Sequence, residues 1–222
     1  VLGHGGFRRE SGSVRLMGVV RGEDWGVIGP VPDDALTASS DGELADLLPG
    51  ILRERPDAGL LPGTIVALRD GDLCRTLGGR GRARPGGEAT LVDVDVGEAL
   101  LDGRLHRFVA HLVVRPNRHP GRWWVAANAA HRGGWNVAPR AHPGDGLLDV
   151  LDASVPLGEV PAAWRRLGRG VHVPHPAIRQ ERTEAVQITF DRPALVQVDG
   201  RPAGRVSDLS IRVRPGALRL AI

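Results

Sequence analysis

Residues 128–149 read NAAHRGGWNVAPRAHPGDGLLD. Glycines, an Ala-Pro pair and two aspartates recur at fixed intervals in this stretch, and a strand-like run begins at Leu147. Glycine and proline punctuate a chain at turns, and β-favouring runs between them indicate strands. The stretch therefore carries more information about the fold than any other part of the chain.

This pattern resembles the signature N-G-x-x-x-G-G-G-x-x-x-A-P-x-A-x-x-D-D-G-L-L-D of the diacylglycerol kinase superfamily, the lipid kinases that include bacterial diacylglycerol kinases and sphingosine kinases. Two later blocks follow in family order and at family spacing. Asp199-Gly200 is similar to the D-G-E motif, and RPGAL at 214–218 is similar to the closing P-G-A-L strand. In the first block the matching residues are Gly133, Gly134, Ala138, Pro139, Ala141, Asp145, Gly146, Leu147, Leu148 and Asp149.

The resemblance covers most of the chain from about residue 35 onward and implies an α+β fold of the lipid-kinase and NAD-kinase type. We expect an N-terminal α/β open sheet that binds nucleotide over residues 1–85. A mainly antiparallel β-sandwich domain for the lipid substrate is expected over residues 86–213. The last strand, 214–222, is a candidate to return to the first domain.

Composition is that of an ordinary globular chain, with 41% hydrophobic and 25% charged residues among 222. The pI of ≈ 10.6 reflects the absence of lysine and tyrosine, so the net charge of +3 is the better guide. Cys74 has no partner cysteine for a disulfide or a metal site. It is expected to pack as a small buried hydrophobic residue. The protein is expected to be soluble and cytoplasmic, with peripheral attachment to membranes.

Local patterns predict the elements of the first domain. Leu44, Leu47, Leu48, Ile51 and Leu52 recur at helical spacing after Ser40 or Asp41, either of which can cap the helix. The runs 14–20, 25–29, 35–38 and 63–68 indicate strands, and 72–77 indicates a short helix. The Gly/Arg-rich stretch 78–87 reads as a solvated loop, with contact to phosphate or anionic headgroups as the functional alternative.

The second domain is expected to be built from strands with one helix. Val92, Val94 and Val96 alternate with aspartates, and a hairpin turn is expected at 101–104. The helix is predicted at 160–167, with Trp164 and Leu167 on one face. Further strands are predicted at 105–114, 123–127, 147–151, 186–190, 195–198, 209–213 and 217–221.

The resemblance implies a catalytic role for Asp199, as the general base, and a nucleotide-binding role for Asp41, Gly42, Asp72 and Gly200. Phosphoryl transfer needs a carboxylate beside the accepting hydroxyl and a divalent metal on the phosphates, so ATP and Mg²⁺ are the expected cofactors. A D-G pair is also a common hairpin turn. We expect the three aspartates to converge in one crevice between the domains.

Several positions depart from the family motifs. Two phosphate-cradling glycines are replaced by Ser39 and Ser40, and a threonine is replaced by Glu43; the same residues also read as a helix cap and capping turn. Leu68-Arg69 replaces the family's G-T pair. Arg201 replaces the glutamate of D-G-E, so that a permanent cation stands where the family has an acceptor. These changes keep open a catalytically impaired relative that only binds lipid or nucleotide.

In bacterial relatives the first Asp of D-G-L-L-D binds a structural Mg²⁺ with two main-chain oxygens. The resemblance places such a site at Asp145, Leu148 and Val150, and a plain turn before a strand is the alternative. Trp123-Trp124 should point one ring to each face of a strand, one into the core and one toward a lipid cleft or an interface. The histidines at 106, 111, 119, 131, 142, 172 and 175 lack metal-site spacing and are expected at the surface or in loops.

The resemblance implies an ATP-dependent lipid kinase that acts on a diacylglycerol-like lipid at the membrane surface, with an apolar cleft near 128–134. The sequence leaves open whether the protein forms a homodimer. An NAD kinase is a weaker alternative, because residues 128–149 match the lipid kinases. Nucleic-acid binding by the Gly/Arg loop ranks last, since that loop lacks interleaved aromatic residues.

Overall fold

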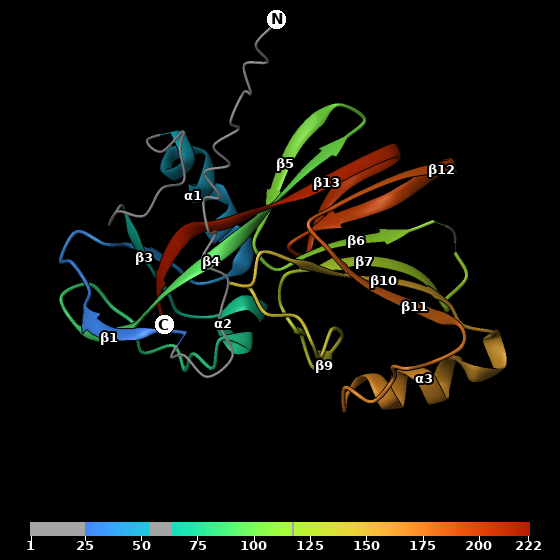
Figure 1. Cartoon of the computed structure of the whole chain (residues 1–222), viewed down its shortest axis with the longest axis horizontal. Coiled ribbons are helices and arrows are strands. Elements are labelled where there is room, and N and C mark those ends of the chain that lie inside the picture. Colours follow the sequence, from blue (N-terminus) through green and yellow to red (C-terminus); the bar gives the residue numbers. More distant parts are fainter. Residues whose placement is uncertain (1–24, 54–63, 117) are drawn as a thin grey trace, which may run out of the picture.

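The computed structural model describes residues 25–53, 64–116 and 118–222. The strand expected at 14–20 lies outside this part of the chain. Figure 1 shows two domains joined by a pair of long strands that run side by side, β4 (Glu88–Leu101) and β13 (Arg201–Ala221). Because each of these strands belongs to both domains, the domains share one hydrogen-bonded framework.

The first domain is a small α/β unit. Its elements are β1 (Val27–Pro30), β2 (Leu36–Ala38), α1 (Asp41–Arg53), β3 (Ile65–Leu68) and α2 (Asp72–Thr76). Strands β2 and β3 are parallel, and β3 pairs in parallel with the last residues of β13 through Arg219–Ile65 and Ala221–Ala67. Each of β2 and β3 is followed by a helix, so α1 and α2 begin at the carboxyl ends of neighbouring strands, where ligands bind in open α/β sheets.

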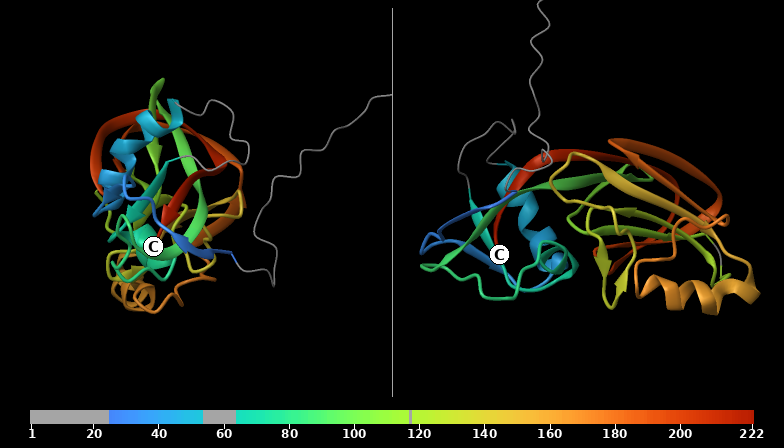
Figure 2. Two further views of the ribbon diagram at one scale, coloured as in Figure 1. Left: turned by 90° about the vertical axis from the view of Figure 1, so that its left-hand side faces the viewer. Right: turned by 60° about the horizontal axis from the view of Figure 1, so that its bottom comes forward.

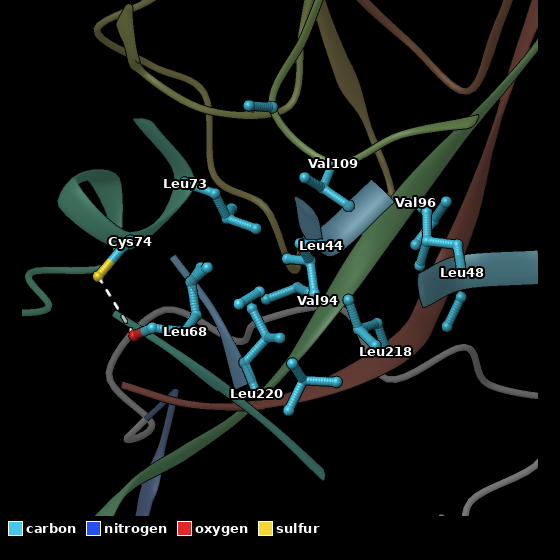
Figure 3. Close-up of a cluster of buried hydrophobic side chains, with 14 of the residues drawn as sticks. Leu44, Leu48, Leu68, Leu73, Cys74, Val94, Val96, Val109, Leu218 and Leu220 are labelled. Atoms are coloured by element: carbon cyan, nitrogen blue, oxygen red, sulfur yellow. Dashed lines mark hydrogen bonds between the residues drawn. The ribbon is translucent and has the colours of Figure 1, made fainter. Parts of the chain in front are cut away.

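The core of the first domain is packed between α1, α2 and the sheet. Leu44 and Leu48 of α1 meet Leu68 and Leu220 there, all fully buried (Figure 3). Cys74 is buried in the same cluster, and its thiol lies 3.6 Å from the carbonyl oxygen of Leu68. The cysteine therefore packs as the predicted small hydrophobe, and burial raises its thiol pKa.

The second domain is an antiparallel β-sandwich. Its strands belong to an 11-stranded sheet that runs through both domains in the order β1-β4-β13-β12-β6-β7-β10-β11. Outside this order, β2 pairs with β3, β3 with β13, and β5 with β4. Phe108, Leu112, Leu148 and Leu209 fill the space between its layers. Its remaining strands are β5 (Arg104–Phe108), β6 (His111–Arg115), β7 (Arg122–Ala127), β10 (Leu148–Ser154), β11 (Ile178–Thr183) and β12 (Ala185–Val198), with the separate hairpin β8 (His131–Arg132) and β9 (Trp135–Asn136).

One helix covers the outer face of the sandwich. The short 3₁₀ turn η1 (Leu157–Glu159) leads into α3 (Val160–Leu167), which lies at the end of the molecule farthest from the first domain (Figure 2). The predicted helix at 160–167 is thus confirmed.

Three strand predictions were wrong in their limits. The run 105–114 is two strands, since Val109 and Ala110 turn the chain between β5 and β6. The pairs predicted at 186–190 with 195–198, and at 209–213 with 217–221, are each one strand. They continue through irregularities in register, between Thr189 and Ala194 and between Arg214 and Leu218.

Candidate active site between the two domains

The N-terminus of α2 is held by a carboxylate from α1. Asp41 Oδ2 accepts from the backbone N–H of Asp72 at 2.7 Å, and Oδ1 accepts from Leu73 at 3.1 Å. Gly71, just before α2, has φ of 116°, and a Cβ there would lie 2.4 Å from Asp41 Oδ1. Only glycine therefore lets Asp41 approach. Burial raises the pKa of Asp41 to about 6, although both hydrogen bonds oppose this.

Asp72 joins α2 to the signature stretch of the second domain. Its Oδ1 accepts from the N–H of Gly133 at 2.6 Å, and Arg75 donates to the Gly133 carbonyl at 2.5 Å. Thr76 Oγ1 also accepts from the N–H of His131 at 3.2 Å. The short helix is thereby bound to both domains, and the second oxygen of Asp72, Oδ2, faces His111.

His111 lies buried between the aspartates, with 2% of its surface exposed. Its Nε2 is 2.9 Å from the carbonyl oxygen of Ala129, which can only accept, so Nε2 carries the proton. Burial lowers the pKa of His111 to about 3, and the charge of Arg132 adds to this effect. The ring is neutral, and its Nδ1, 3.9 Å from Asp72 Oδ2, forms no ion pair.

Asp199 sits in a tight turn between β12 and β13 and receives three backbone hydrogen bonds. Its φ is 45°, and that of Gly200 is 78°. Oδ2 accepts from Val109, and Oδ1 accepts from Ala110 and His111, each at 2.9 Å. A carboxylate has about four acceptor positions, so among the described residues one position on Oδ2 has no donor. Burial raises the pKa of Asp199 to about 7, against the lowering effect of the three N–H groups.

These contacts bring the three aspartates into one cluster. Asp41 holds the N–H of Asp72, Asp72 faces the His111 ring, and the N–H of His111 binds Asp199. The negative charge of Asp41 also acts on Asp199. The three aspartates are therefore brought together. The carboxylate of Asp41 is occupied as a helix cap, whereas Asp72 Oδ2 has no hydrogen bond among the described residues.

The other residues predicted to bind nucleotide lie beside this cluster. Gly42 opens α1, and a Cβ at this position would be 2.6 Å from the Nε of Arg201, whose guanidinium covers it. Arg201 donates to both oxygens of Asp46 at 2.7 Å. Glu43 accepts from the N–H of Ser39 at 2.7 Å, and Ser40 Oγ accepts from the N–H of Glu43 at 3.1 Å. Ser40, rather than Asp41, thus caps α1.

The residues predicted to hold a structural Mg²⁺ make other contacts in this structure. The carboxylate of Asp145 is paired with Arg182 and accepts from the N–H of Leu147 at 3.0 Å. Leu148 and Val150 are paired in β10, between β7 and β11. The guanidinium already balances the charge that would attract a metal ion, so a metal would have to displace Arg182. Over the described residues, no group of three or more His, Cys, Asp and Glu side chains could hold a metal ion.

Two buried polar residues that sequence reasoning missed support the crossing between the domains. Asp95, 1% exposed, accepts from Gly146 at 2.7 Å and from Gly216 at 2.8 Å, and so connects the signature stretch to the P-G-A-L strand. Asn128, fully buried, donates to the carbonyls of Asp95 and Val109 at 2.9 and 2.8 Å. The position of Asn128 at the head of the signature was the available signal.

An apolar pocket lies on the outer face of the sandwich, under α3. It has a volume of ≈ 100 Å³ and lies between α3, β7, β9 and β10. Trp123, Trp135, Trp164 and Leu167 line it, together with Arg132 of β8. Trp124, by contrast, is buried in the sandwich core, so the two rings face opposite sides as predicted.

Arg132 connects the pocket to the carboxylates. It donates to Gln197 Oε1 at 3.0 Å, and Gln197 lies two residues before Asp199. Burial lowers the pKa of Arg132, and the negative charge of Asp72 partly opposes this effect. The expectation of surface or loop histidines was wrong for His111, which is buried in β6. His172 lies in a loop, as expected, but it is only 4% exposed and lines the pocket.

The family profile described as the YegS C-terminal NAD kinase beta sandwich-like domain matches residues 98–222, more than half of the chain. The chain belongs to this family. Residues 98–222 of this YegS-type chain hold Asp199, His111 and the pocket, whereas Asp41 and Asp72 lie before them.

Solved structures show the same fold for both domains. The chain is similar to a presumed diacylglycerol kinase from Bacillus anthracis strain Sterne, with a TM-score of 0.62 and 15% identity over 85% of this chain and 78% of that one. A diacylglycerol kinase structure from the same organism matches with a TM-score of 0.56 and 14% identity over 83% and 74% of the two chains. No curated protein sequence matches significantly. Among the described residues, no helix is long and apolar enough to cross a bilayer.

Proposed function

We propose that the protein is an ATP-dependent lipid kinase of the diacylglycerol kinase type, which transfers the γ-phosphate to a lipid hydroxyl at a membrane surface. The observation that carries this proposal is the convergence of Asp72, His111 and Asp199, together with an apolar pocket whose Arg132 interacts electrostatically with Asp72. Family membership and the diacylglycerol kinase fold support it.

Asp199 is suited to take the proton of the attacking hydroxyl. Its three backbone hydrogen bonds fix the carboxylate and leave one acceptor position on Oδ2 for the substrate. A base works best when its pKa is close to the working pH, and burial brings the pKa of Asp199 to about 7.

Asp72 offers the group that a magnesium nucleotide would need. Mg²⁺ is usually bound by one or two carboxylates together with substrate phosphates, and Asp72 Oδ2 has no hydrogen bond among the described residues. Mg²⁺ would neutralise charge on the phosphates. Asp41 acts indirectly, because it fixes the first turn of α2 and so the position of Asp72.

The pocket offers a binding site for an apolar part of the lipid. Its tryptophans and Leu167 would take an apolar segment, while Arg132 would lie between that segment and the carboxylates. The lipid hydroxyl could then reach Asp199 while the rest of the molecule remains in the membrane.

A second candidate is a relative that binds lipid or nucleotide without catalysis. It is favoured by Arg201, whose guanidinium covers Gly42 and pairs with Asp46 at the start of α1, where the resemblance places phosphate. The polar groups of Ser40 and Glu43 are likewise used within the chain.

A transfer assay with radiolabelled ATP, Mg²⁺ and mixed diacylglycerols in vesicles separates the two candidates. The kinase predicts labelled lipid, and Asp199→Asn should lower the rate by at least 100-fold, within the range of general base contributions. Folded protein that binds vesicles but transfers no phosphate would leave the binding module. Full activity of Asp199→Asn would remove the proposed base.

A further inference from the structure

His172 is a buried polar side chain in an apolar pocket. The residue is 4% exposed and lies among the tryptophans and aliphatic side chains that line the space under α3. Neither Nδ1 nor Nε2 has a hydrogen-bond partner among the described residues. The backbone of Val137 is close enough to raise the pKa of His172 slightly, but no hydrogen bond forms between the two residues. A buried polar group without a partner is costly, and such groups are rare in folded proteins.

The chemistry of the ring limits what can satisfy it. Burial lowers the pKa of His172, so the imidazole is neutral and offers one N–H donor and one lone-pair acceptor. A purely hydrocarbon ligand would fill the pocket but leave both positions unsatisfied. A ligand oxygen, either a carbonyl or a hydroxyl, would satisfy one of them.

The size of the pocket limits the rest of the ligand. A dry cavity of about 150 Å³ accommodates benzene, so a pocket of ≈ 100 Å³ takes a short segment and not a whole acyl chain. Arg132 is part of the same lining and also feels the charge of Asp72. The bound segment is therefore the part of the lipid next to its head group, where ester carbonyls and chain hydroxyls occur.

We propose that this pocket selects lipids that carry a hydrogen-bonding oxygen close to the head group, and that His172 is the specificity-determining contact. It rests on the proposed function, in which this pocket binds a segment of the lipid substrate. It names the side chain that would distinguish an oxygenated lipid from its deoxygenated counterpart.

Binding can be measured without ATP from the fluorescence of Trp123, Trp135 and Trp164. One matched pair is dioctanoylglycerol and its dialkyl ether, which differ in the ester carbonyls; another is a long-chain 1,3-diol and the corresponding 1-alkanol. We expect the oxygenated member of at least one pair to bind about tenfold more tightly, as one retained hydrogen bond implies. The pair that shows the preference identifies the oxygen as carbonyl or hydroxyl.

Three variants test the role of His172. His172→Phe should reduce the preference to less than twofold, because it fills the space without a donor or acceptor. His172→Gln should keep part of it. His106→Phe, in β5 and outside the pocket lining, is the matched control and should leave it unchanged.

The outcomes separate this inference from the proposed kinase activity. Equal binding within both pairs by the wild-type protein, or a full preference in His172→Phe, would overturn the role of His172 even if phosphate transfer is found. A preference that depends on His172 would support it even in a protein that transfers no phosphate. Failure of every lipid to bind would overturn the lipid reading and this inference together.

Discussion

Single residues decide the geometry of the site through close backbone approach. Gly71 admits the Asp41 carboxylate, and the backbone N–H groups of Val109, Ala110 and His111 hold Asp199. Family resemblance located the aspartates in the sequence. Gly71 and His111 could not be found that way, because their roles depend on contacts with residues far away in the chain.

Gly71→Ala should destabilise the protein by about 1–3 kcal/mol. A Cβ at this position would lie 2.4 Å from Asp41 Oδ1, and a non-glycine residue at φ of 116° is strained. Urea unfolding measures the change. Gly50→Ala, in α1 with open space around it, is the control and should raise stability by about 0.5–1 kcal/mol. Equal effects of the two substitutions would contradict the close approach of Asp41.

His172→Phe should raise thermal stability, because it replaces an unsatisfied buried polar group with an apolar one. A gain of about 1 kcal/mol corresponds to about 2–4 °C in Tm for a chain of this size. Differential scanning calorimetry without lipid measures it. A lower Tm would indicate that the imidazole already has a partner.

Secondary-structure elements were predictable where their patterns are local. The regular leucine spacing of α1 predicted the helix, and of the two predicted caps, Ser40 and Asp41, the structure uses Ser40. The long strands β12 and β13 were divided in the prediction, because Pro193 and Pro215-Gly216 read as breaks. In the folded chain these positions are irregularities in register within continuous strands, and pairing with the neighbouring strand resumes after each of them.

The alternation of valine and aspartate in β4 predicted the strand but not the burial of each of its residues. Asp93 is exposed and pairs with Arg219, as alternation predicts, but Asp95 is 1% exposed. Beyond Asp93 the strand passes between the two domains and is buried on both faces. Local periodicity carries no information about that crossing.

Ser40→Ala should cost about 1 kcal/mol in unfolding free energy, because it removes the acceptor for the Glu43 N–H at the start of α1. Ser39→Ala is the matched control, since only the backbone of Ser39 takes part in the cap. Urea titration compares the two variants. A loss no larger than that of the control would argue against capping by Ser40.

The whole molecule is organised by two strands that serve both domains. Residues of β4 and β13 contribute to the hydrophobic core of each half. Family blocks indicated two domains and their order, whereas the sharing of strands depends on register, which the sequence does not display. We infer that neither domain folds independently of the other.

A single unfolding transition is therefore expected. Tryptophan fluorescence reports mainly on the second domain, since all tryptophans except Trp25 lie there, and far-UV circular dichroism reports on both. The two signals should change together during a urea titration, as in two-state unfolding. Separate midpoints would show that the halves unfold independently.

Stability should fall as pH rises from about 4 to 7. Burial raises the pKa of Asp41 and Asp95 to about 6 and that of Asp199 to about 7, above their ordinary value of 3.8. Between these values the three carboxyl groups bind more protons in the folded protein than in the unfolded chain, so raising the pH favours unfolding. The lowered pKa of buried His111 acts in the opposite direction, but among the largest shifts it is one group against three. Melting at pH 5 and pH 8 tests the sign, and Asp95→Asn should reduce the slope. A Tm that rises over this interval would contradict buried carboxylates of raised pKa.

The uninterrupted passage of β4 and β13 between the halves also bears on catalysis. A hinge rotation between the halves would have to bend or shear the antiparallel ladder between these two strands, at a cost in backbone hydrogen bonds. In the lipid kinase proposed above, nucleotide and lipid would then meet across a gap of nearly constant width. Its turnover would depend on how the lipid leaves the bilayer rather than on closure of the protein.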